Sequence, residues 1–198
     1  DIILLKNPTR EKITKTLNKL SKTLNENDNL LIYYAGHGNE VKKKGHWLPS
    51  NAEKDDDTHW ISNDYISSKL NNINAMNILV IADSCFSGTL TRNVSDTKYK
   101  MDKSLKVYLD TKSRIVISSG GLKPVLDSGG GDNSIFAGIL ISYLTNNFEA
   151  ITATKLYNDI SQDVLKLSIE LGFEQTPMLA NLPTSGHIGP DFVFLPKY

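Results

Sequence analysis

The sequence predicts an α/β protein with a mostly parallel central sheet and helices on both of its faces. Two observations lead to this class. Short apolar runs typical of buried strands, at residues 30–35, 78–82 and 114–118, alternate along the chain with longer segments of helical periodicity. Strands separated by crossover helices pair in parallel, so that helices cover both faces of the sheet. The length of 198 residues is enough for one domain with a full hydrophobic core.

The first helix is predicted from the spacing of apolar residues. Ile13, Leu17, Leu20 and Leu24 recur at helical intervals and therefore share one helical face. Thr9 precedes this segment and is a suitable N-cap, because its hydroxyl can accept a backbone N–H of the first turn. Further caps are expected at Ser62 or Asn63, at Ser134, and at Thr152 or Thr154.

Shorter segments are predicted from their composition. Residues 2–5 have the pattern of a short strand, and residues 178–180 and 192–195 have that of short closing strands. Residues 38–50 are expected to form a loop, and the lysine run at 42–44 within it is expected to be a solvated turn.

Composition and charge exclude several classes of partner. The chain carries 22 basic and 22 acidic residues, so there is no electrostatic case for nucleic acid or an anionic membrane as the main partner. The longest apolar run, residues 135–144, is about half of the roughly 20 residues that a membrane span requires. No signal peptide is visible, and a single cysteine excludes an internal disulfide and fits a reducing compartment. We therefore expect a cytoplasmic protein.

Two predicted strands end in reactive side chains. Residues 29–38 read NLLIYYAGHG, with His37 between two glycines, and residues 77–88 read NILVIADSCFSG, with the only cysteine, Cys85, just after the strand. In open parallel sheets, ligands bind beyond the carboxyl ends of the strands. His37 and Cys85 are 48 residues apart, which leaves room for a crossover helix. We therefore expect the imidazole and the thiol at the same edge of the sheet.

These motifs resemble the paired catalytic motifs of caspase-fold cysteine peptidases, closest to the metacaspase-like and bacterial caspase-like branch. A cysteine with a histidine about 50 residues upstream is the spacing of caspases. Two further stretches are similar to this branch, RIVISSGGLKPVLDSGGGDNSIFAGIL and EQTPMLANLPTSGHIGPDFVFLP. The resemblance implies a caspase-like three-layer α/β/α sandwich over residues 1–198. The family's first strand and helix have no counterpart in the sequence, so we expect an N-terminally incomplete peptidase domain.

The resemblance implies a cysteine endopeptidase. A thiolate is the nucleophile, and His37 would hold its proton, protonate the leaving amine and then activate water to hydrolyse the thioester. The backbone N–H groups of Gly38 and Cys85 are the implied oxyanion hole. Taken alone, Cys85 could instead be a small buried apolar residue, and His37 a satisfied polar residue at a strand end. A serine hydrolase built on Ser84 or Ser87 is disfavoured, because the GxSxG motif is missing.

Asp83 is the candidate specificity residue. Side chains alternate along a strand, so positions 83 and 85 project to the same side, where a carboxylate opposes thiol ionisation and is better explained by binding a cation. In metacaspase-like enzymes the matching Asp binds an Arg or Lys before the cleaved bond, so we predict cleavage after Arg or Lys. The alternative is that Asp83 only binds loop N–H groups. Weaker pocket candidates are Ser118, Ser119 and Asp127, the last in a glycine-rich loop predicted at 120–133.

Residues 89–113 are predicted to be a long mobile connection, at the position where caspase-type enzymes are often cut between their large and small subunits. Its basic residues are Arg92, Lys98, Lys100, Lys103, Lys106 and Lys112. A zymogen specific for basic residues could process itself there, and the alternative is an ordinary solvated loop. The expected partners are a protein or peptide substrate and a regulatory protein or upstream domain.

No cofactor is expected. Some metacaspases bind calcium through aspartates, and Asp64 roughly matches one of them, but Arg92 stands where a carboxylate would be needed. The acidic run at 55–57 fits a solvated loop better than a calcium site, which requires 6–8 converging oxygens. Two alternatives stay open beside the peptidase. One is a catalytically silent or partner-gated interaction module with the caspase fold, and the other is a non-proteolytic cysteine hydrolase with the same dyad.

Overall fold

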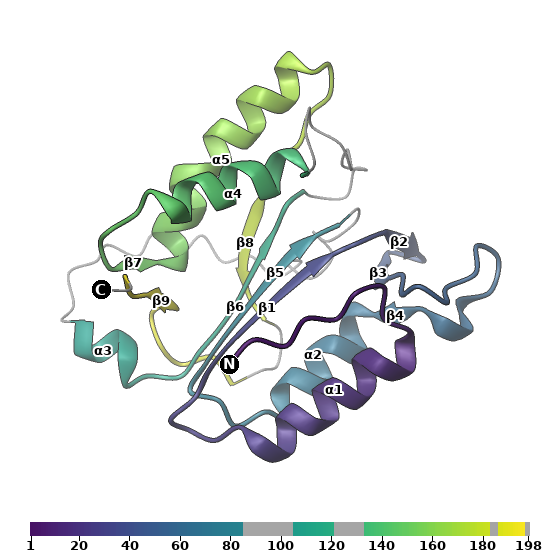
Figure 1. Ribbon diagram of the computed structural model, residues 1–198, viewed down its shortest axis with the longest axis horizontal. Helices are drawn as coiled ribbons and strands as arrows, with labels where there is room; N and C mark the ends of the chain where they lie inside the picture. Colours follow the sequence, from purple (N-terminus) through teal and green to yellow (C-terminus); the bar gives the residue numbers. More distant parts are fainter. Residues whose placement is uncertain (85–104, 121–132, 183–185, 197–198) are drawn as a thin grey trace.

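The structure, a computed structural model, describes residues 1–84, 105–120, 133–182 and 186–196. At its centre is a four-stranded sheet with the strand order β1-β5-β6-β8 (Figure 1). The strands β1 (Asn29–Ala35), β5 (Asn77–Asp83) and β6 (Ser113–Ser118) are parallel, and β8 (Met178–Asn181) is antiparallel to β6. The predicted, mostly parallel central sheet is therefore confirmed.

Helices cover both faces of this sheet, which confirms the three-layer α/β/α arrangement (Figure 1). On one face lie α1 (Arg10–Thr23) and α2 (Asn63–Asn71), and on the other lie α4 (Ile135–Thr145) and α5 (Ala153–Glu170). Each pair of helices packs on its own hydrophobic core. The sheet therefore separates two cores, as in other layered α/β domains.

The central strand β5 contributes to both cores. Ile78 and Val80 pack in the core under α1 and α2, whereas Leu79 and Ile81 pack in the core under α4 and α5. All seven residues of β5 are buried. The unbroken apolar run in the sequence is the consequence of this position, since a strand covered on both faces has no polar side.

The predicted helix caps are confirmed. In each case a hydroxyl accepts the backbone N–H of the third residue after it, which satisfies one of the donors that a helix leaves free at its start. The caps are Thr9 for α1, Ser62 for α2, Ser134 for α4 and Thr152 for α5. Gly172 follows α5 with a φ of 88°, a left-handed conformation that glycine adopts without strain.

The segment after β1 is a hairpin and not the loop that the sequence predicted for residues 38–50. The strands β2 (Gly38–Val41) and β3 (Lys44–Trp47) are antiparallel, and β4 (Ile61–Ser62) pairs with β3. Lys42 and Lys43 form the turn with φ values of 51° and 65°, as the primed turns of two-residue hairpins require. The lysine run is a turn, as expected, but it joins two strands.

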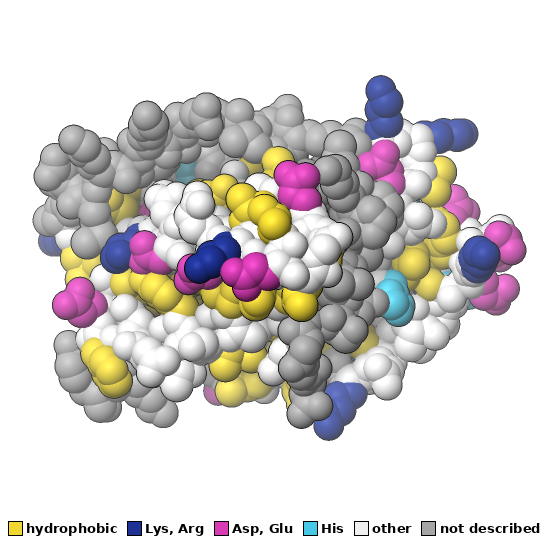
Figure 2. Space-filling view, turned by 90° about the horizontal axis from the view of Figure 1, so that it is seen from above, with side chains coloured by type: hydrophobic (Ala, Val, Ile, Leu, Met, Phe, Trp, Pro, Cys, Tyr) yellow, Lys and Arg dark blue, Asp and Glu magenta, His cyan; other side chains and the backbone are white. Residues whose placement is uncertain are grey.

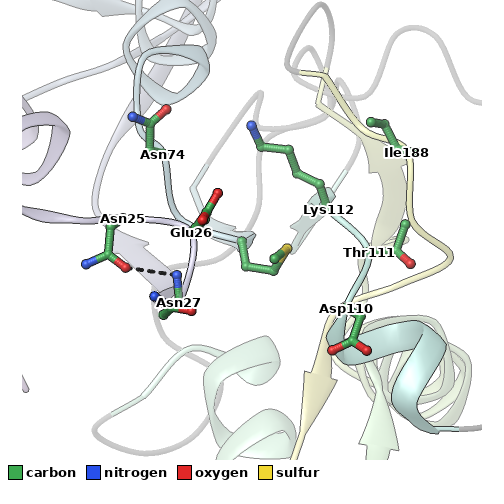
Figure 3. Close-up of a pocket in the computed structure, with 9 residues that line it drawn as sticks. Asn25, Glu26, Asn27, Asn74, Asp110, Thr111, Lys112 and Ile188 are labelled. Atoms are coloured by element: carbon green, nitrogen blue, oxygen red, sulfur yellow. Dashed lines mark hydrogen bonds between the residues drawn. The ribbon is translucent and has the colours of Figure 1, made fainter.

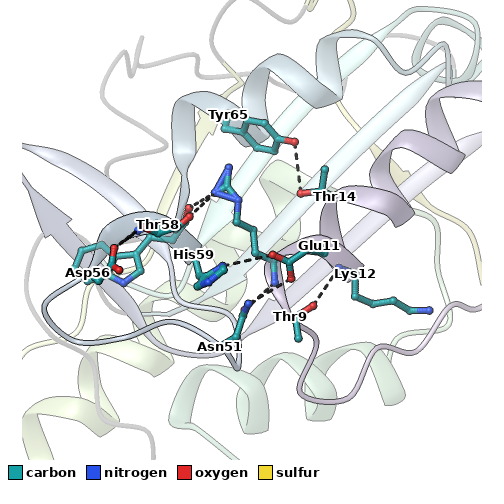
Figure 4. A network of polar contacts seen from close by, with 11 residues as sticks. Thr9, Glu11, Lys12, Thr14, Asn51, Asp56, Thr58, His59 and Tyr65 are labelled. Carbon is teal, nitrogen blue, oxygen red and sulfur yellow. Dashed lines mark hydrogen bonds and ion pairs between the residues drawn. The ribbon is translucent and has the colours of Figure 1, made fainter.

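A polar network attaches the start of α1 to the segment that follows the hairpin (Figure 4). The Arg10 guanidinium donates to the carbonyl oxygens of Thr58 and Trp60, at 3.2 and 2.9 Å. Glu11 pairs with His59 at 3.4 Å, in the short 3-10 helix η1 (Asp57–His59). These contacts fix the acidic loop 51–60 against α1.

Two predictions for the amino-terminal part are wrong. Residues 2–5 form no strand, and Ile2 and Leu4 are exposed, because no neighbouring strand among the described residues pairs with this segment. The strand β1 is not covered on both faces. It is an edge strand in the described sheet, and its residues alternate between exposed and half-buried, so that Leu31 and Tyr33 expose about two fifths of their surface, 43% and 41%.

The carboxyl-terminal half differs from the predicted pattern in detail. Residues 89–104 of the predicted mobile connection lie outside the described residues, and its next part forms the short helix α3 (Leu105–Leu109). Most of the predicted glycine-rich loop 120–133 also lies outside them. The closing strand β9 (Val193–Phe194) pairs with β7 (Ile151–Thr152), and this two-stranded ribbon is separate from the main sheet.

The described surface carries charges of both signs. On the face seen from above Figure 1, acidic and basic side chains are interspersed (Figure 2), in agreement with the net charge of zero. Among the described helices, none combines the length and the apolar character that crossing a bilayer would require.

Candidate active site

The carboxyl ends of β1 and β5 lie side by side at one edge of the sheet (Figure 1). The two strands are paired in register along their whole length, and the last pair joins Ala35 to Asp83. The backbone N–H of Gly36 donates to the carbonyl of Asp83 at 3.3 Å, and the N–H of Ser119 donates to the carbonyl of Ala82 at 2.9 Å. The ends of the three parallel strands β1, β5 and β6 are therefore held together at one edge of the sheet.

His37 lies two residues beyond the end of β1, in the connection to β2, and is exposed. Its backbone is fixed from two sides. The Tyr34 hydroxyl donates to the carbonyl of His37 at 2.7 Å, and the N–H of Leu48 donates to the same oxygen at 3.0 Å. The ring of Tyr34 stacks on Trp47, with centroids 4.1 Å apart. His37 is therefore presented to solvent from a rigid main chain.

Gly36 makes this arrangement possible. A Cβ atom at position 36 would lie 2.8 Å from the Tyr34 hydroxyl, closer than packed atoms allow, so a larger residue would displace the tyrosine that holds the backbone of His37. Burial raises the pKa of Tyr34, and its hydroxyl therefore stays protonated as a donor at neutral pH. The close approach of the Tyr34 hydroxyl therefore explains why the second residue of the AGHG motif is a glycine.

Asp83 is buried at the end of β5, with 8% of its surface exposed. One of its carboxylate oxygens, Oδ2, accepts two hydrogen bonds. The Tyr33 hydroxyl donates at 3.1 Å and the Ser134 hydroxyl donates at 2.5 Å. The described partners are hydroxyls from β1 and from the start of α4.

Of the other predicted site residues, the structure describes Ser118, Ser119 and Gly38. Cys85 and Asp127 lie outside the described residues. Ser118 is buried at the end of β6 and donates to the carbonyl of Gly120 at 3.1 Å, which uses its hydroxyl within its own loop. The hydroxyl of Ser119 is buried and has no described hydrogen-bond partner. Gly38 begins β2 opposite Trp47.

Arg114 is far from this edge. It lies at the start of β6, its surface is 1% exposed, and its guanidinium donates to the carbonyl oxygens of Met76, Ser113, Ile73 and Ala75. Burial lowers the pKa of Arg114 to about 10, so the group keeps its charge at neutral pH. Its guanidinium therefore satisfies carbonyl groups of the segment between α2 and β5 and of the first residue of β6.

A cavity of about 730 Å³ opens at the amino-terminal end of the sheet, opposite the candidate active site (Figure 3). It is lined by residues that precede the three parallel strands, among them Glu26 before β1, Asn74 before β5, and Asp110 and Lys112 before β6. Because catalytic groups collect beyond the carboxyl ends of parallel strands, this cavity is not the site that the sequence predicts.

The family of the chain follows from its sequence. The family model described as the caspase domain, of the C14 peptidases, matches residues 1–185. The chain belongs to the caspase-domain family.

Two solved structures agree with this fold. A Geobacter sulfurreducens protein from structural genomics is 20% identical, with a TM-score of 0.57, over 94% of this chain and 80% of its own. Caspase-1 from Spodoptera frugiperda is 14% identical, with a TM-score of 0.60, over 98% of this chain and 73% of its own. No curated protein matches the chain in sequence.

Asp64, the candidate calcium ligand of this caspase domain, forms an ion pair with a lysine. The carboxylate of Asp64 is exposed and pairs with the ammonium of Lys44 at 3.0 Å. In the acidic loop, the Asp56 carboxylate accepts the N–H of Thr58 at 2.8 Å and caps η1. Within the part of the chain that the structure describes, no group of three metal-ligating side chains converges.

Sequence reasoning did not assign Tyr33 and Ser134 to the site of this caspase domain. Tyr33 shares a face of β1 with Ala35, which pairs with Asp83, so the alternation along β1 is a signal that could have placed Tyr33 beside Asp83. Ser134 was predicted only as a helix cap. Its second hydrogen bond depends on where α4 begins relative to β5, which no local pattern in the sequence specifies.

Proposed function

We propose that this caspase domain is a cysteine endopeptidase that uses His37 and Cys85 as a catalytic dyad and cleaves after Arg or Lys. The observation that carries the proposal is the register of β1 on β5. Every residue of β5 is 48 positions later in the chain than its partner in β1, from Asn29 and Asn77 to Ala35 and Asp83. His37 and Cys85 are separated by the same 48 positions.

This coincidence of spacing supports a contact between the two side chains. Neighbouring strands are about 4.8 Å apart, and the pairing already continues to Gly36 through its hydrogen bond to Asp83. If the offset of 48 positions holds for two residues beyond the last pair, Ala35 and Asp83, then His37 and Cys85 start from adjacent positions. That separation is within the range in which a base can take the proton of a nucleophile.

The proposed reaction has two steps. The Cys85 thiolate attacks the peptide carbonyl, the C–N bond breaks, and His37 gives its proton to the leaving amine, which leaves a thioester. Water then attacks the thioester, His37 accepts its proton, and the thiolate leaves with release of the acid. Backbone N–H groups of Gly38 and Cys85 are proposed to stabilise the oxyanion. No metal or other cofactor takes part in this scheme.

Asp83 supports the preference for a basic residue before the cleaved bond. Its carboxylate is buried at the end of β5, two positions before Cys85 in the chain, and the two hydroxyls that hold it are neutral. No described cation lies within ion-pair distance of it, whereas the charge of a substrate Arg or Lys would balance it. A buried carboxylate is costly unless a charge pairs with it. The pocket candidates Ser119 and Asp127 remain part of this proposal.

The test uses peptides that differ only in the residue before a fluorogenic amide, Arg, Lys, Asp or Ala. We expect cleavage of the Arg and Lys peptides alone, and a loss on the order of 10³-fold in kcat/KM for Cys85→Ala and for His37→Gln. His59→Gln is the matched control, since this histidine pairs with Glu11 near the start of α1. Cleavage that survives Cys85→Ala contradicts the dyad. No cleavage of any peptide contradicts the proposal and favours the interaction module.

A further inference from the structure

The carboxylate of Asp83 is held asymmetrically by the protein. Tyr33, from β1, and Ser134, at the start of α4, both donate to the same oxygen, Oδ2, at 3.1 and 2.5 Å. Among the described residues, none donates to the other oxygen, Oδ1. The two oxygens of this buried carboxylate are therefore not equivalent toward a third group.

Both donors have fixed orientations. The Ser134 hydroxyl accepts the backbone N–H of Ala137 at 2.9 Å, so the α4 cap uses its lone pair and directs its proton to Asp83. Burial of its hydroxyl raises the pKa of Tyr33, and the neighbouring Asp83 carboxylate raises it further. The Tyr33 hydroxyl therefore remains a donor throughout the neutral pH range.

This asymmetry limits how the carboxylate can accept a substrate cation. Each carboxylate oxygen offers about two lone-pair directions, and two hydroxyls occupy those of Oδ2. An arginine forms its strongest carboxylate contact with two parallel N–H groups on both oxygens. With Oδ2 already filled, an arginine can give Asp83 only one N–H, which is what a lysine ammonium also gives.

We infer that Tyr33 and Ser134 are positioning residues that make Asp83 a single-point acceptor through Oδ1, so that the site takes Lys about as well as Arg. This inference rests on the proposed function, because it concerns the basic side chain before the cleaved bond. Tyr33 and Ser134 act through Asp83 and are not catalytic residues. Their hydroxyls exclude the two-pronged contact by which a carboxylate discriminates in favour of arginine.

The test is the ratio of kcat/KM for an Arg peptide to that for the matched Lys peptide. In the wild-type protein this ratio should lie within about threefold of one. Tyr33→Phe keeps the ring and frees one lone pair of Oδ2, so the ratio should rise roughly tenfold through a lower KM for the Arg peptide, with kcat little changed. Ser134→Ala should move the ratio in the same direction.

Two control variants separate this effect from a general disturbance. Tyr65→Phe removes a hydroxyl that donates to Thr14 on the α1 and α2 side of the sheet, at 3.5 Å, and should leave the ratio unchanged. Ser134→Thr retains a hydroxyl and should restore the wild-type ratio. Because Ser134→Ala also removes the cap of α4, Tyr33→Phe carries the test if the serine variant does not fold.

The inference and the proposed function fail in different ways. An active Tyr33→Phe enzyme with an unchanged ratio, or a wild-type enzyme that already prefers Arg by more than tenfold, overturns the inference and leaves the peptidase proposal intact. A change of equal size in Tyr65→Phe also overturns it. A wild-type protein that cleaves neither peptide overturns the proposed function, and the inference falls with it.

Discussion

Ala35 at the end of β1 lies opposite Asp83 at the end of β5, and the N–H of Gly36 continues the pairing by donating to the Asp83 carbonyl at 3.3 Å. This relationship places the AGHG motif beside Asp83, the first residue of the DSCFSG motif, at one edge of the sheet. The backbone of Asp83 builds this edge, and its carboxylate is the group proposed to recognise the substrate.

Removing the charge of Asp83 should remove the preference for basic residues. Asp83→Asn keeps the size of the side chain but loses the ion pair with the substrate. The kcat/KM for Arg and Lys peptides should fall roughly 30-fold or more, because a desolvated charge pair contributes about 2 kcal/mol or more to binding. Peptide-library profiling of this variant checks the result, and a retained preference for Arg and Lys would remove Asp83 from the specificity site.

Self-cleavage should be restricted to the first part of the 89–113 connection. Lys106 lies within α3, and the carbonyl of Lys112 accepts N–H groups from Ile188 and Gly189 at 2.9 and 2.7 Å, so neither backbone is free to enter a peptidase site. Intact mass spectrometry of the incubated protein should show new ends after Arg92, Lys98, Lys100 or Lys103.

The matched control for self-cleavage is the Cys85→Ala chain at the same concentration. It should remain intact over the period in which the wild-type chain is cut. Equal stability of the two chains, or cutting after Lys112, would argue against self-processing as proposed.

Stability should fall as the pH is lowered below about 6.5, the usual pKa of histidine. Burial lowers the pKa of His187, and the charge of Arg114 lowers it further. In the folded state Nδ1 of His187 accepts the backbone N–H of Arg114 at 3.0 Å, a bond that requires this nitrogen to be unprotonated. A pKa that is lower in the folded state gives stability that is present above the unfolded value and is lost as pH falls through the folded value.

His187→Asn tests this pH dependence, because it offers an acceptor that does not titrate. The free energy of unfolding, measured by urea titration between pH 7.5 and 5.5, should decline less steeply in the variant than in the wild-type protein. Parallel curves for the two proteins would show that His187 does not carry the effect. Other buried groups, such as Asp191, are common to both proteins and cancel in the comparison.

Arg114→Met should destabilise the fold by about 3 kcal/mol, because it leaves several buried carbonyl groups without a donor. Arg10→Met is the matched control. The Arg10 guanidinium also donates to two carbonyl groups but is partly exposed, so its loss should cost about 1 kcal/mol. Thermal or urea unfolding of the two variants checks the difference, and equal losses would contradict the structural role assigned to Arg114.

The sequence was sufficient where local chemistry determines structure. The spacing of Ile13 and Leu17 with the Thr9 cap predicted α1, and the unbroken apolar run of β5 predicted burial on both faces. The similar run of β1 gave the same prediction, which is wrong, because a strand's place in the sheet is set by its neighbours. The hairpin turn was missed because Lys42 and Lys43 are not the Asn-Gly type that marks such turns.

In the candidate site, too, local motifs were predictable from the sequence and contacts between distant elements were not. The two motifs and their spacing predicted that His37 and Cys85 belong to one edge. Cys85 lies outside the described residues, and the register of β1 on β5 shows that the strands before the two motifs end together. The contacts of Tyr33 and Ser134 with Asp83 join residues 50 and 51 positions apart. The contact of Tyr33 follows from the alternation along β1 once its register on β5 is known, whereas that of Ser134 depends on how α4 docks on the sheet, which no periodicity or motif in the sequence encodes.

The most direct measurement is covalent labelling of the folded protein with a thiol-reactive ketone peptide that ends in arginine, followed by intact mass spectrometry. Cys85 is the only cysteine, so one adduct identifies the site, and a small alkylating reagent reports the general accessibility of the thiol. Peptide labelling should be at least about 100-fold slower in His37→Gln than in the wild-type protein. Labelling that is equally fast in both, or no faster in the folded than in the denatured chain, would contradict the dyad.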